Sequence, residues 1–371
     1  MEGSIPYAKP SITKLELDLV AEAMAEGWGT KSNFYISKFE DEFSKKIGIT
    51  NAIATSSCTG ALHLGLAAAG IGPGDEIILA ESNWIATLAP ILYLGAKPVL
   101  VDIERNSWCI DPELVEKAIN GRTRAIIATH LYGNLCDMES LLRIARKYNI
   151  LLIEDAAEAL GSMYGEKSAG TLGDFGVFSF HGSKTITTGE GGMLVTKDAG
   201  MAVKVRQLNN HGREAKSIKQ FWPELLGYKY KMGNIQAAIG IAQVQRFEEL
   251  VSRKVEIFEN YINLSKNIEG ISFNQPRSSC KSGYWMPNVL FDASLNVNRE
   301  SILEAFKVEK IDARVFFWPL SDLPFIGESP KNTISRDIAM RSINLPSFHE
   351  ISNFQQKRII DVVERIVQDA K

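Results

Sequence analysis

The sequence predicts an α/β fold built on a mostly parallel, mixed sheet of seven strands. Seven short apolar runs occur between residues 52 and 196, and several are apolar on successive residues, as in strands buried on both faces. Amphipathic stretches of about ten residues separate most of these runs, which is typical of βαβ units. The expected strands are Ala52–Thr55, Glu76–Ala80, Pro98–Asp102, Ala125–Thr129, Leu151–Glu154, Val177–Phe180 and Gly192–Thr196.

The connecting helices have recognisable starts and stops. Asp111 is an N-cap residue followed by proline at the first helical position. The cluster GIGPGD at 70–75 ends one helix and turns into the next strand. After Leu151 the strands follow one another with hardly a helix between them, so we expect the alternating pattern to break there. The expected helices are Thr59–Ala69, Ile85–Tyr93, Asp111–Ile119 and Asp137–Tyr148.

The pattern changes again beyond about residue 235. A long helical stretch, Ile235–Lys266, leads into a smaller segment that runs to residue 371. We therefore expect two domains. Residues 1–240 would form an N-terminal segment and the large domain, and residues 241–371 would form a connecting helix and a smaller C-terminal α+β domain.

Composition excludes several classes of protein. Of 371 residues, 45% are hydrophobic and 23% charged, which excludes a disordered chain. The net charge of −3 gives no basic field for nucleic acid or an anionic membrane. No run approaches the ~20 apolar residues of a membrane helix, and the first residues lack a signal-peptide pattern, so we expect a cytoplasmic protein. The four cysteines show no C-x-x-C pair or zinc spacing, and we expect no metal site.

The segment 173–193 (GDFGVFSFHGSKTITTGEGGM) is the richest in chemistry. Lys184 lies there between two expected strands, among hydroxyls and glycines. Such a lysine binds phosphate, forms a Schiff base, or is an ordinary surface lysine in a hairpin. A P-loop needs G-x-x-x-x-G-K-[ST], but five residues separate Gly176 from Gly182, and Ser183 precedes the lysine. The nucleotide-binding alternative therefore fails on spacing.

A Schiff-base site for pyridoxal phosphate needs further groups, and candidates for them are present. Asp155 ends a buried strand, where it would hold the pyridine nitrogen protonated or simply cap the next helix. The segment 56–62 (SSCTGAL) feeds a strand into a helix, which provides either an anion cradle or a plain N-cap. Trp84 would cover a ring face or pack as a core aromatic.

Taken together, these segments resemble the DegT/DnrJ/EryC1/StrS family of sugar aminotransferases. The resemblance implies the aspartate-aminotransferase fold (type I), with residues 1–240 holding pyridoxal 5'-phosphate, and amination of a keto group on a nucleotide-linked sugar. It runs almost from end to end of the chain. The blocks that carry it are SSCTGALHLGLAAAGIGPGDEII, LGAKPVLVDIE, HLYGNLCDM, LIEDAAEALGS, LGDFGVFSFHGSKTITTGEGGM and GYKYKMGNIQAAIGIAQ.

The resemblance also assigns roles to individual residues. Lys184 would form the Schiff base and then act as general acid and base. Asp155 would pair with the pyridinium nitrogen, and Glu158 would contact the ring hydroxyl. The phosphate turn would be Ser57, Cys58 and Thr59, and a further phosphate ligand would be Ser179. Trp84 would stack on the ring. Asn234 would reach the phosphate of the neighbouring subunit. This last role implies a homodimer with shared active sites. His181 precedes the lysine and is expected only to hydrogen-bond beside the site.

Within the family, the chain is most similar to 4-aminotransferases of the perosamine-synthase type, which act on nucleotide-linked 4-keto-6-deoxy sugars. The expected donor is L-glutamate, and the pathway is amino-sugar synthesis for surface polysaccharide. The sequence departs from that type at 27–32 (GWGTKS) and 312–321 (DARVFFWPLS), both near the sugar in the family. An eight-carbon acidic keto sugar therefore stays open as an alternative substrate. A sugar dehydratase and a non-catalytic relative are further alternatives. In the family, dehydratases carry histidine at the position of Lys184, and the intact set Asp155, Glu158, Ser179 and Lys184 argues against a non-catalytic relative. The candidate substrate contacts are Trp28, Arg213, Arg314 and Trp318, with the two arginines suited to a carboxylate.

Overall fold

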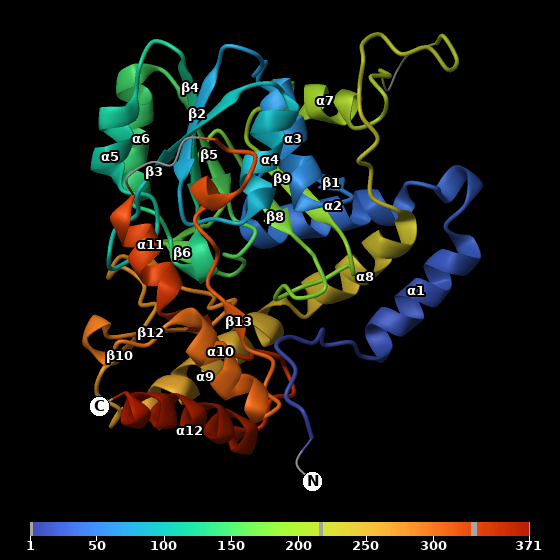
Figure 1. Ribbon diagram of the computed structural model, residues 1–371. Coiled ribbons are helices and arrows are strands. Elements are labelled where there is room, and N and C mark those ends of the chain that lie inside the picture. The colour runs from blue at the N-terminus through green and yellow to red at the C-terminus, as the bar shows by residue number, and fades with distance from the viewer. Residues whose placement is uncertain (1–2, 215–217, 328–331, 371) are drawn as a thin grey trace.

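A computed structural model describes residues 3–214, 218–327 and 332–370. Its largest sheet has seven strands in the order β1-β9-β8-β5-β4-β2-β3 (Figure 1). All seven expected strands are present, with ends that shift by at most two residues: β1 (Asn51–Thr55), β2 (Glu76–Ala80), β3 (Lys97–Val101), β4 (Thr123–Thr129), β5 (Leu151–Asp155), β8 (Phe175–Ser179) and β9 (Gly192–Thr196). The pairs β3–β2–β4–β5–β8 are parallel, and β9 alone runs against its two neighbours.

Helices cover both faces of this sheet, as expected where strands are apolar on successive residues. On one face, side chains such as Ile77 and Leu79 pack with α3 (Cys58–Ala68), α4 (Ile85–Tyr93) and α7 (Ala199–Leu208). On the other face, Ile78 and Ile126 pack with α5 (Pro112–Ala118) and α6 (Met138–Tyr148). The sequence predicts four of these helices, and Asp111 caps α5 through the N–H of Glu113.

The first two helices were not predicted from the sequence. Helix α1 (Lys14–Glu26) begins at a capping box between Thr13 and Glu16, and α2 (Phe34–Ile47) ends at Gly48 in the left-handed region. Helix α2 packs on the edge of the large sheet around β1 and on α8 (Asn234–Gln245), and α1 packs on α8 from outside. Figure 1 shows α1 standing away from the body of the molecule beside α8.

The alternating pattern breaks after β5, as the sequence indicates. Short strands replace the next helix: β6 (Met163–Tyr164) pairs with β7 (Lys167–Ser168) on one side and with β11 (Cys280–Lys281) on the other, in a small sheet of three strands. Strand β8 follows, and the segment that carries Lys184 connects it to β9. This connection is long and irregular, so it can place side chains above the carboxyl ends of the parallel strands.

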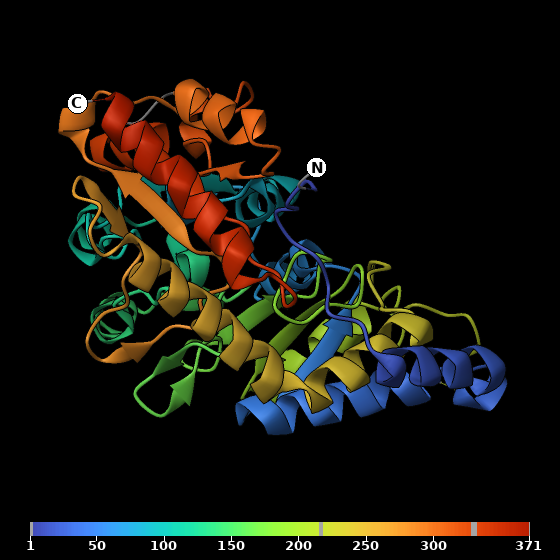
Figure 2. The same cartoon turned by 90° about the horizontal axis from the view of Figure 1, so that it is seen from below.

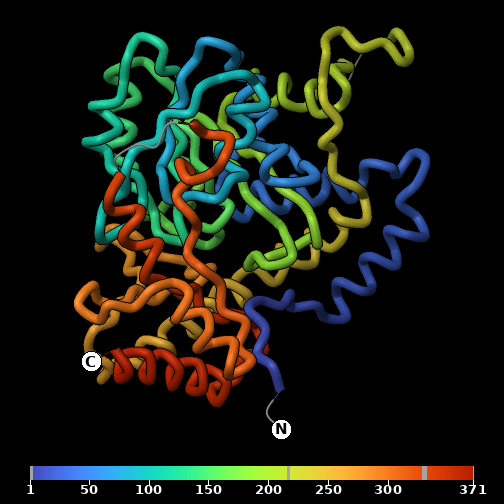
Figure 3. The backbone as a smooth tube through the Cα atoms, viewed as in Figure 1, coloured from blue at the N-terminus to red at the C-terminus, as the bar shows by residue number. Residues whose placement is uncertain are grey.

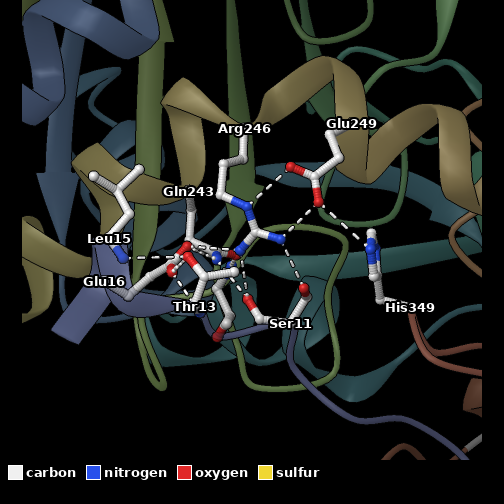
Figure 4. A network of polar contacts seen from close by, with 9 residues as sticks. Ser11, Thr13, Leu15, Glu16, Gln243, Arg246, Glu249 and His349 are labelled. Atoms are coloured by element: carbon white, nitrogen blue, oxygen red, sulfur yellow. Dashed lines mark hydrogen bonds and ion pairs between the residues drawn. The ribbon is translucent and has the colours of Figure 1, made fainter.

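The prediction of one long helix over Ile235–Lys266 is wrong. Helix α8 ends at Gln245, and α9 (Phe247–Ser265) begins after Arg246, whose backbone (φ −99°, ψ 14°) leaves the helical region. The Arg246 guanidinium contacts Ser11, Glu16 and Glu249, so side-chain bonds compensate for the broken helix (Figure 4). The break separates the helix of the large-sheet unit from the helix that supports the C-terminal part.

The C-terminal residues build a separate sheet with its own core. Its strand order is β10-β12-β14-β13, with all pairs antiparallel. Figure 2 shows α9 and α12 lying side by side, and both contribute to one apolar cluster with this sheet. The elements are β10 (Ile271–Phe273), β12 (Asn288–Phe291), α10 (Arg299–Val308), β13 (Arg314–Val315), α11 (Thr333–Met340), β14 (Ser342–Asn344) and α12 (Asn353–Asp369).

The N-terminal segment joins this C-terminal unit rather than the large sheet. Ile5 pairs with Ile311 through two backbone hydrogen bonds, and Tyr7 accepts a hydrogen bond from the N–H of Ser347. Figure 3 shows the start of the chain running along the C-terminal part before it enters α1. The domain boundary near residue 240 stays a prediction. Among the described residues, no helix is long and apolar enough to cross a membrane.

Candidate active site

A cavity of about 830 Å³ opens at the carboxyl ends of the parallel strands. This is the edge of an open α/β sheet at which ligands bind. The cavity brings together predicted residues that lie far apart in the sequence and come from several elements. They are Ser57, Cys58, Thr59, Trp84, Asp155, Glu158, Ser179 and Lys184.

Lys184 lies at one side of this cavity. Its backbone N–H donates to the carbonyl of His181 and closes a turn in the connection between β8 and β9. The Nζ atom is 3.6 Å from Glu158 Oε1 and 3.5 Å from the centroid of the Trp285 ring. The side chain is only 14% exposed, so the amine is shielded yet borders a space large enough for a ligand.

Asp155 ends β5 and is almost completely buried. Its Oδ1 accepts the N–H of Ala157, and Thr87 Oγ1 of α4 lies 2.5 Å from its Oδ2. Thr87 is in turn 2.9 Å from Asn83, so a buried polar chain fixes the orientation of the carboxylate. A fixed carboxylate that lines a cavity can stabilise a positive charge on a bound ring.

Glu158 is the second carboxylate of the cavity. Burial raises the pKa of its carboxyl above the usual range, while the charge of Lys184 opposes that increase. Its Oε2 accepts the N–H of Tyr132 at 2.9 Å. The two carboxylates have different neighbours and can therefore serve different parts of a bound ring. Asp155 would contact the ring nitrogen, and Glu158 would contact a ring hydroxyl.

The N-terminus of α3 provides an anion site at the same edge. Ser57 caps the helix by accepting the N–H of Gly60, and the first backbone N–H groups of a helix have no partner within it. Gly192 of β9 passes so close that a Cβ there would lie 2.4 Å from the nitrogen of Cys58, which explains a glycine at that position. Burial and the charge of Asp155 raise the pKa of the Cys58 thiol, so this residue serves as a small neutral side chain.

These groups fit pyridoxal phosphate. An amine, a fixed carboxylate and a helix N-terminus surround one cavity, and they match an aldehyde, a pyridine nitrogen and a phosphate respectively. Trp84 is 57% exposed at the rim of the cavity and packs on Phe317, with ring centroids 5.8 Å apart. Its position allows it to cover one face of a bound ring.

Of the four candidate substrate contacts, only Arg314 lines this cavity in a single chain, where it pairs with Asp312. Arg213 lines a second cavity of about 670 Å³ beside Arg206 and Lys231. Trp28 is 62% exposed, and its indole donates to the carbonyl of Met24. Trp318 is half exposed and stacks on the guanidinium of Arg299.

Asn234 lies outside the cavity at the start of α8. Its Nδ2 donates to the carbonyls of Gly27 and Lys31, and its Oδ1 accepts the N–H of Tyr35. Within one chain it therefore joins α8 to the turn between α1 and α2. Its contact with a partner's phosphate stays a prediction.

The sequence argument missed part of the cavity wall. Tyr7, Trp285, Phe317 and Asn344 line it from the N-terminal segment and the C-terminal unit. Burial, together with the charge of Glu158, raises the pKa of the Tyr7 phenol. Phe317 belongs to the segment 312–321 that the resemblance places near the sugar, whereas Tyr7, Trp285 and Asn344 stand in no recognisable motif and reach the cavity only through the tertiary fold. Among the described residues, no group of three or more His, Cys, Asp or Glu side chains could hold a metal ion.

Comparison with known proteins agrees with this geometry. The sequence matches the model of the DegT/DnrJ/EryC1/StrS aminotransferase family over residues 10–364. It is 38% identical to the GDP-perosamine synthase of Escherichia coli O157:H7, with 98% of this chain and 99% of that protein covered. It is 34% identical to the GDP-perosamine synthase of Vibrio cholerae, with 97% and 98% covered.

Solved structures give the same result. A putative sugar aminotransferase of Streptococcus pneumoniae, in its pyridoxal-phosphate form, superposes with a TM-score of 0.92 at 26% identity over all of both chains. DesI, solved in the presence of its TDP-sugar product, gives a TM-score of 0.91 at 26% identity, with 99% of this chain and 94% of that chain covered. The fold is therefore the expected type I fold, and these relatives do not favour a dehydratase or an eight-carbon acidic substrate. The chain belongs to the DegT/DnrJ/EryC1/StrS aminotransferase family and is a sugar aminotransferase that depends on pyridoxal phosphate.

Proposed function

We propose that the chain transfers the amino group of L-glutamate to the 4-keto group of a nucleotide-linked 4-keto-6-deoxyhexose, in the synthesis of an amino sugar for surface polysaccharide. The observation that carries the chemistry is the placement of Lys184 within 3.6 Å of Glu158, in the same cavity as Asp155. The choice of sugar is supported by similarity to the GDP-perosamine synthases. The four free cysteines fit a reducing compartment, and we place the protein in the cytoplasm.

The chain's own residues divide the work. When bound, pyridoxal phosphate supplies an electron sink for the carbon that carries the amino group. The N–H groups at the start of α3 would bind the phosphate, and the charge of Asp155 would keep the ring nitrogen protonated. The Lys184 amine would take a proton from the carbon of glutamate that carries the amino group in one half of the reaction. It would deliver a proton to the aminated carbon of the sugar in the other half. Arg314 presents a planar fork of donors to the glutamate carboxylate.

We further propose that two chains form a homodimer with shared active sites. Five large apolar or aromatic side chains are exposed on the turn between α1 and α2, at the first residue of α2 and on the segment before α8. A monomeric surface rarely carries such a group without a partner. These residues are Trp28, Phe34, Phe221, Trp222 and Leu226.

Mixed dimers test the shared site directly. If Asn234 serves the site of its partner, mixing inactive Lys184→Ala with inactive Asn234→Ala should restore activity. In each mixed dimer, one of the two sites carries both substitutions and the other carries neither. Mixing Lys184→Ala with itself after the same treatment is the control. Activity that stays absent from the mixture, with both variants dimeric by light scattering, would contradict sharing through Asn234.

A panel of keto sugars tests the substrate. Each keto sugar of the panel is incubated with the enzyme and glutamate, and 2-oxoglutarate is measured. We expect release with a 4-keto-6-deoxy sugar and none with Lys184→Ala, while Lys167→Ala, which changes an exposed lysine, retains activity. Release only with an eight-carbon acidic keto sugar would overturn the choice of substrate. Sugar consumption without 2-oxoglutarate would indicate dehydration instead.

A further inference from the structure

Trp285 approaches the catalytic lysine in two ways. Its ring lies under the amine, with Lys184 Nζ 3.5 Å from the ring centroid. Its indole Nε1 donates to the carbonyl of Ser183 at 2.8 Å, so it also fixes the backbone immediately before the lysine. The tryptophan is 6% exposed and comes from the C-terminal part of the chain, about 100 residues after the lysine.

We propose that Trp285 is a positioning residue that holds the free ammonium group of Lys184 whenever the lysine is not bonded to the cofactor. This inference rests on the proposed function, in which Lys184 is released in each half of the reaction. The face of an aromatic ring attracts a cation, and tryptophan does so best. Glu158 Oε1, 3.6 Å from the same nitrogen, adds a negative charge. The ring and the carboxylate together give the freed lysine a defined resting place.

The surroundings of Trp285 are rigid enough for this role. Gly283 donates its N–H to Ser162 Oγ, and a Cβ at Gly283 would lie 2.2 Å from the carbonyl oxygen of Leu160. The turn before Trp285 is therefore pressed against the large-sheet unit, and only glycine fits there. The indole also stacks on Tyr132, with ring centroids 6.0 Å apart and planes 21° apart.

Tyr132 connects the same group to the carboxylate. Its backbone N–H donates to Glu158 Oε2, and its hydroxyl accepts a hydrogen bond from Asn344 of β14. Trp285 and Glu158 are thus held by one shared neighbour. Because Tyr132 still donates to Glu158 when Trp285 is substituted, such a variant should lose the contact of the ring with the Lys184 amine and keep the carboxylate in place. The contribution of the ring can then be measured apart from that of Glu158.

The test measures how fast the free amine reacts. The full chain is loaded with pyridoxamine phosphate, so that Lys184 carries no bond to the cofactor, and is treated briefly with acetic anhydride at pH 8. Mass spectrometry then compares acetylation of Lys184 with that of exposed Lys167 in the same sample. Only the neutral amine reacts, so losing an interaction that favours the ammonium should accelerate acetylation of Lys184. A cation–π interaction of typical strength predicts an increase of about 2- to 30-fold in Trp285→Leu.

Fluorinated tryptophans separate this effect from simple opening of the site. Placed at position 285, they keep the shape and the N–H of the indole but withdraw negative charge from its face. We expect the acetylation rate of Lys184 to rise stepwise with the number of fluorine atoms. We also expect kcat to fall more than the KM for glutamate changes. Trp108→Phe, at another buried tryptophan that packs edge-on against Phe316, should leave the rate unchanged.

A rate that is the same at every level of fluorination would overturn the role of Trp285. That result is distinguishable from failure of the proposed function. If the chain were not an aminotransferase, the unsubstituted protein would neither bind pyridoxamine phosphate nor release 2-oxoglutarate from glutamate. Trp285→Phe keeps a ring but loses the N–H, and we expect its acetylation rate to lie between those of the unsubstituted chain and Trp285→Leu.

Discussion

A buried lysine on α9 should make the stability of the protein depend on pH in the alkaline range. Lys254 is 8% exposed and donates to the carbonyl and the hydroxyl of Ser347, at 2.6 and 3.0 Å. Burial lowers its pKa from 10.5 to about 7. Between these two values the unfolded chain binds a proton that the folded chain does not. Raising the pH through this window therefore favours the folded state.

The size of the effect follows from the two pKa values. In Lys254→Met the aliphatic stem is kept and the titrating amine is removed. Between pH 7 and pH 9.5, the stability of the unsubstituted protein should rise relative to this variant by about 3 kcal/mol, since one pKa unit corresponds to about 1.4 kcal/mol. The lost bonds to Ser347 add a constant offset, so the comparison rests on the slope with pH and not on stability at one pH.

Urea unfolding followed by fluorescence and circular dichroism gives the free energy of unfolding at each pH. Lys167→Met, at an exposed lysine, is the matched control and should run parallel to the unsubstituted protein. If the curves for Lys254→Met and the unsubstituted protein also run parallel from pH 7 to pH 9.5, the lysine titrates outside this window and the reasoning from burial is wrong.

Three further predictions concern the site and its support. Gly192→Ala should weaken cofactor binding at least tenfold in an absorbance titration, because the new Cβ would lie 2.4 Å from the nitrogen of Cys58; unchanged binding would contradict the close approach. Cys58 should react with iodoacetamide at pH 7.5 at least tenfold more slowly than a free thiol, because burial raises its pKa, and Cys58→Ser should stay active. Hydrogen bonds from Thr13, Arg246 and Gln243 outweigh burial and lower the pKa of Glu16 to about 2, so the carboxylate stabilises the fold above pH 4.5, and this advantage is lost as the pH falls towards 2. The stability difference between the unsubstituted protein and Glu16→Gln should therefore shrink by about 1 to 2 kcal/mol between pH 6 and pH 3, after allowance for solvent screening, and a constant difference would contradict it.

The sequence predicts the large sheet well because its signals are local. A strand such as Glu76–Ala80 is apolar on every residue after the first, and Asp111 with Pro112 marks a helix start without reference to the rest of the chain. The break at Arg246 could not be predicted in this way. It depends on bonds to Ser11 and Glu16, more than 200 residues earlier, and no local pattern of apolar residues reports them.

The residues of the site also differ in whether the local sequence predicts them. Residues at strand ends and helix starts, such as Asp155 and Ser57, have a local signature, and the structure brings them to one cavity. Trp285 and Tyr7 have no such signature, because the C-terminal unit and the N-terminal segment place them there only after folding. Asn234 and Arg213 line no part of this cavity in a single chain, and the predicted role of Asn234 depends on a second subunit.

The central claim is that Lys184 is the residue that holds the cofactor and carries the proton. The most direct measurement is to add pyridoxal phosphate to the full chain, reduce with borohydride and map the labelled peptide by mass spectrometry. The account predicts one label per chain, on Lys184, and prior incubation with glutamate should prevent it by converting the cofactor to its amine form. A label on another lysine, or a Lys184→Ala variant that still consumes glutamate and aminates the sugar at the original rate, would contradict it.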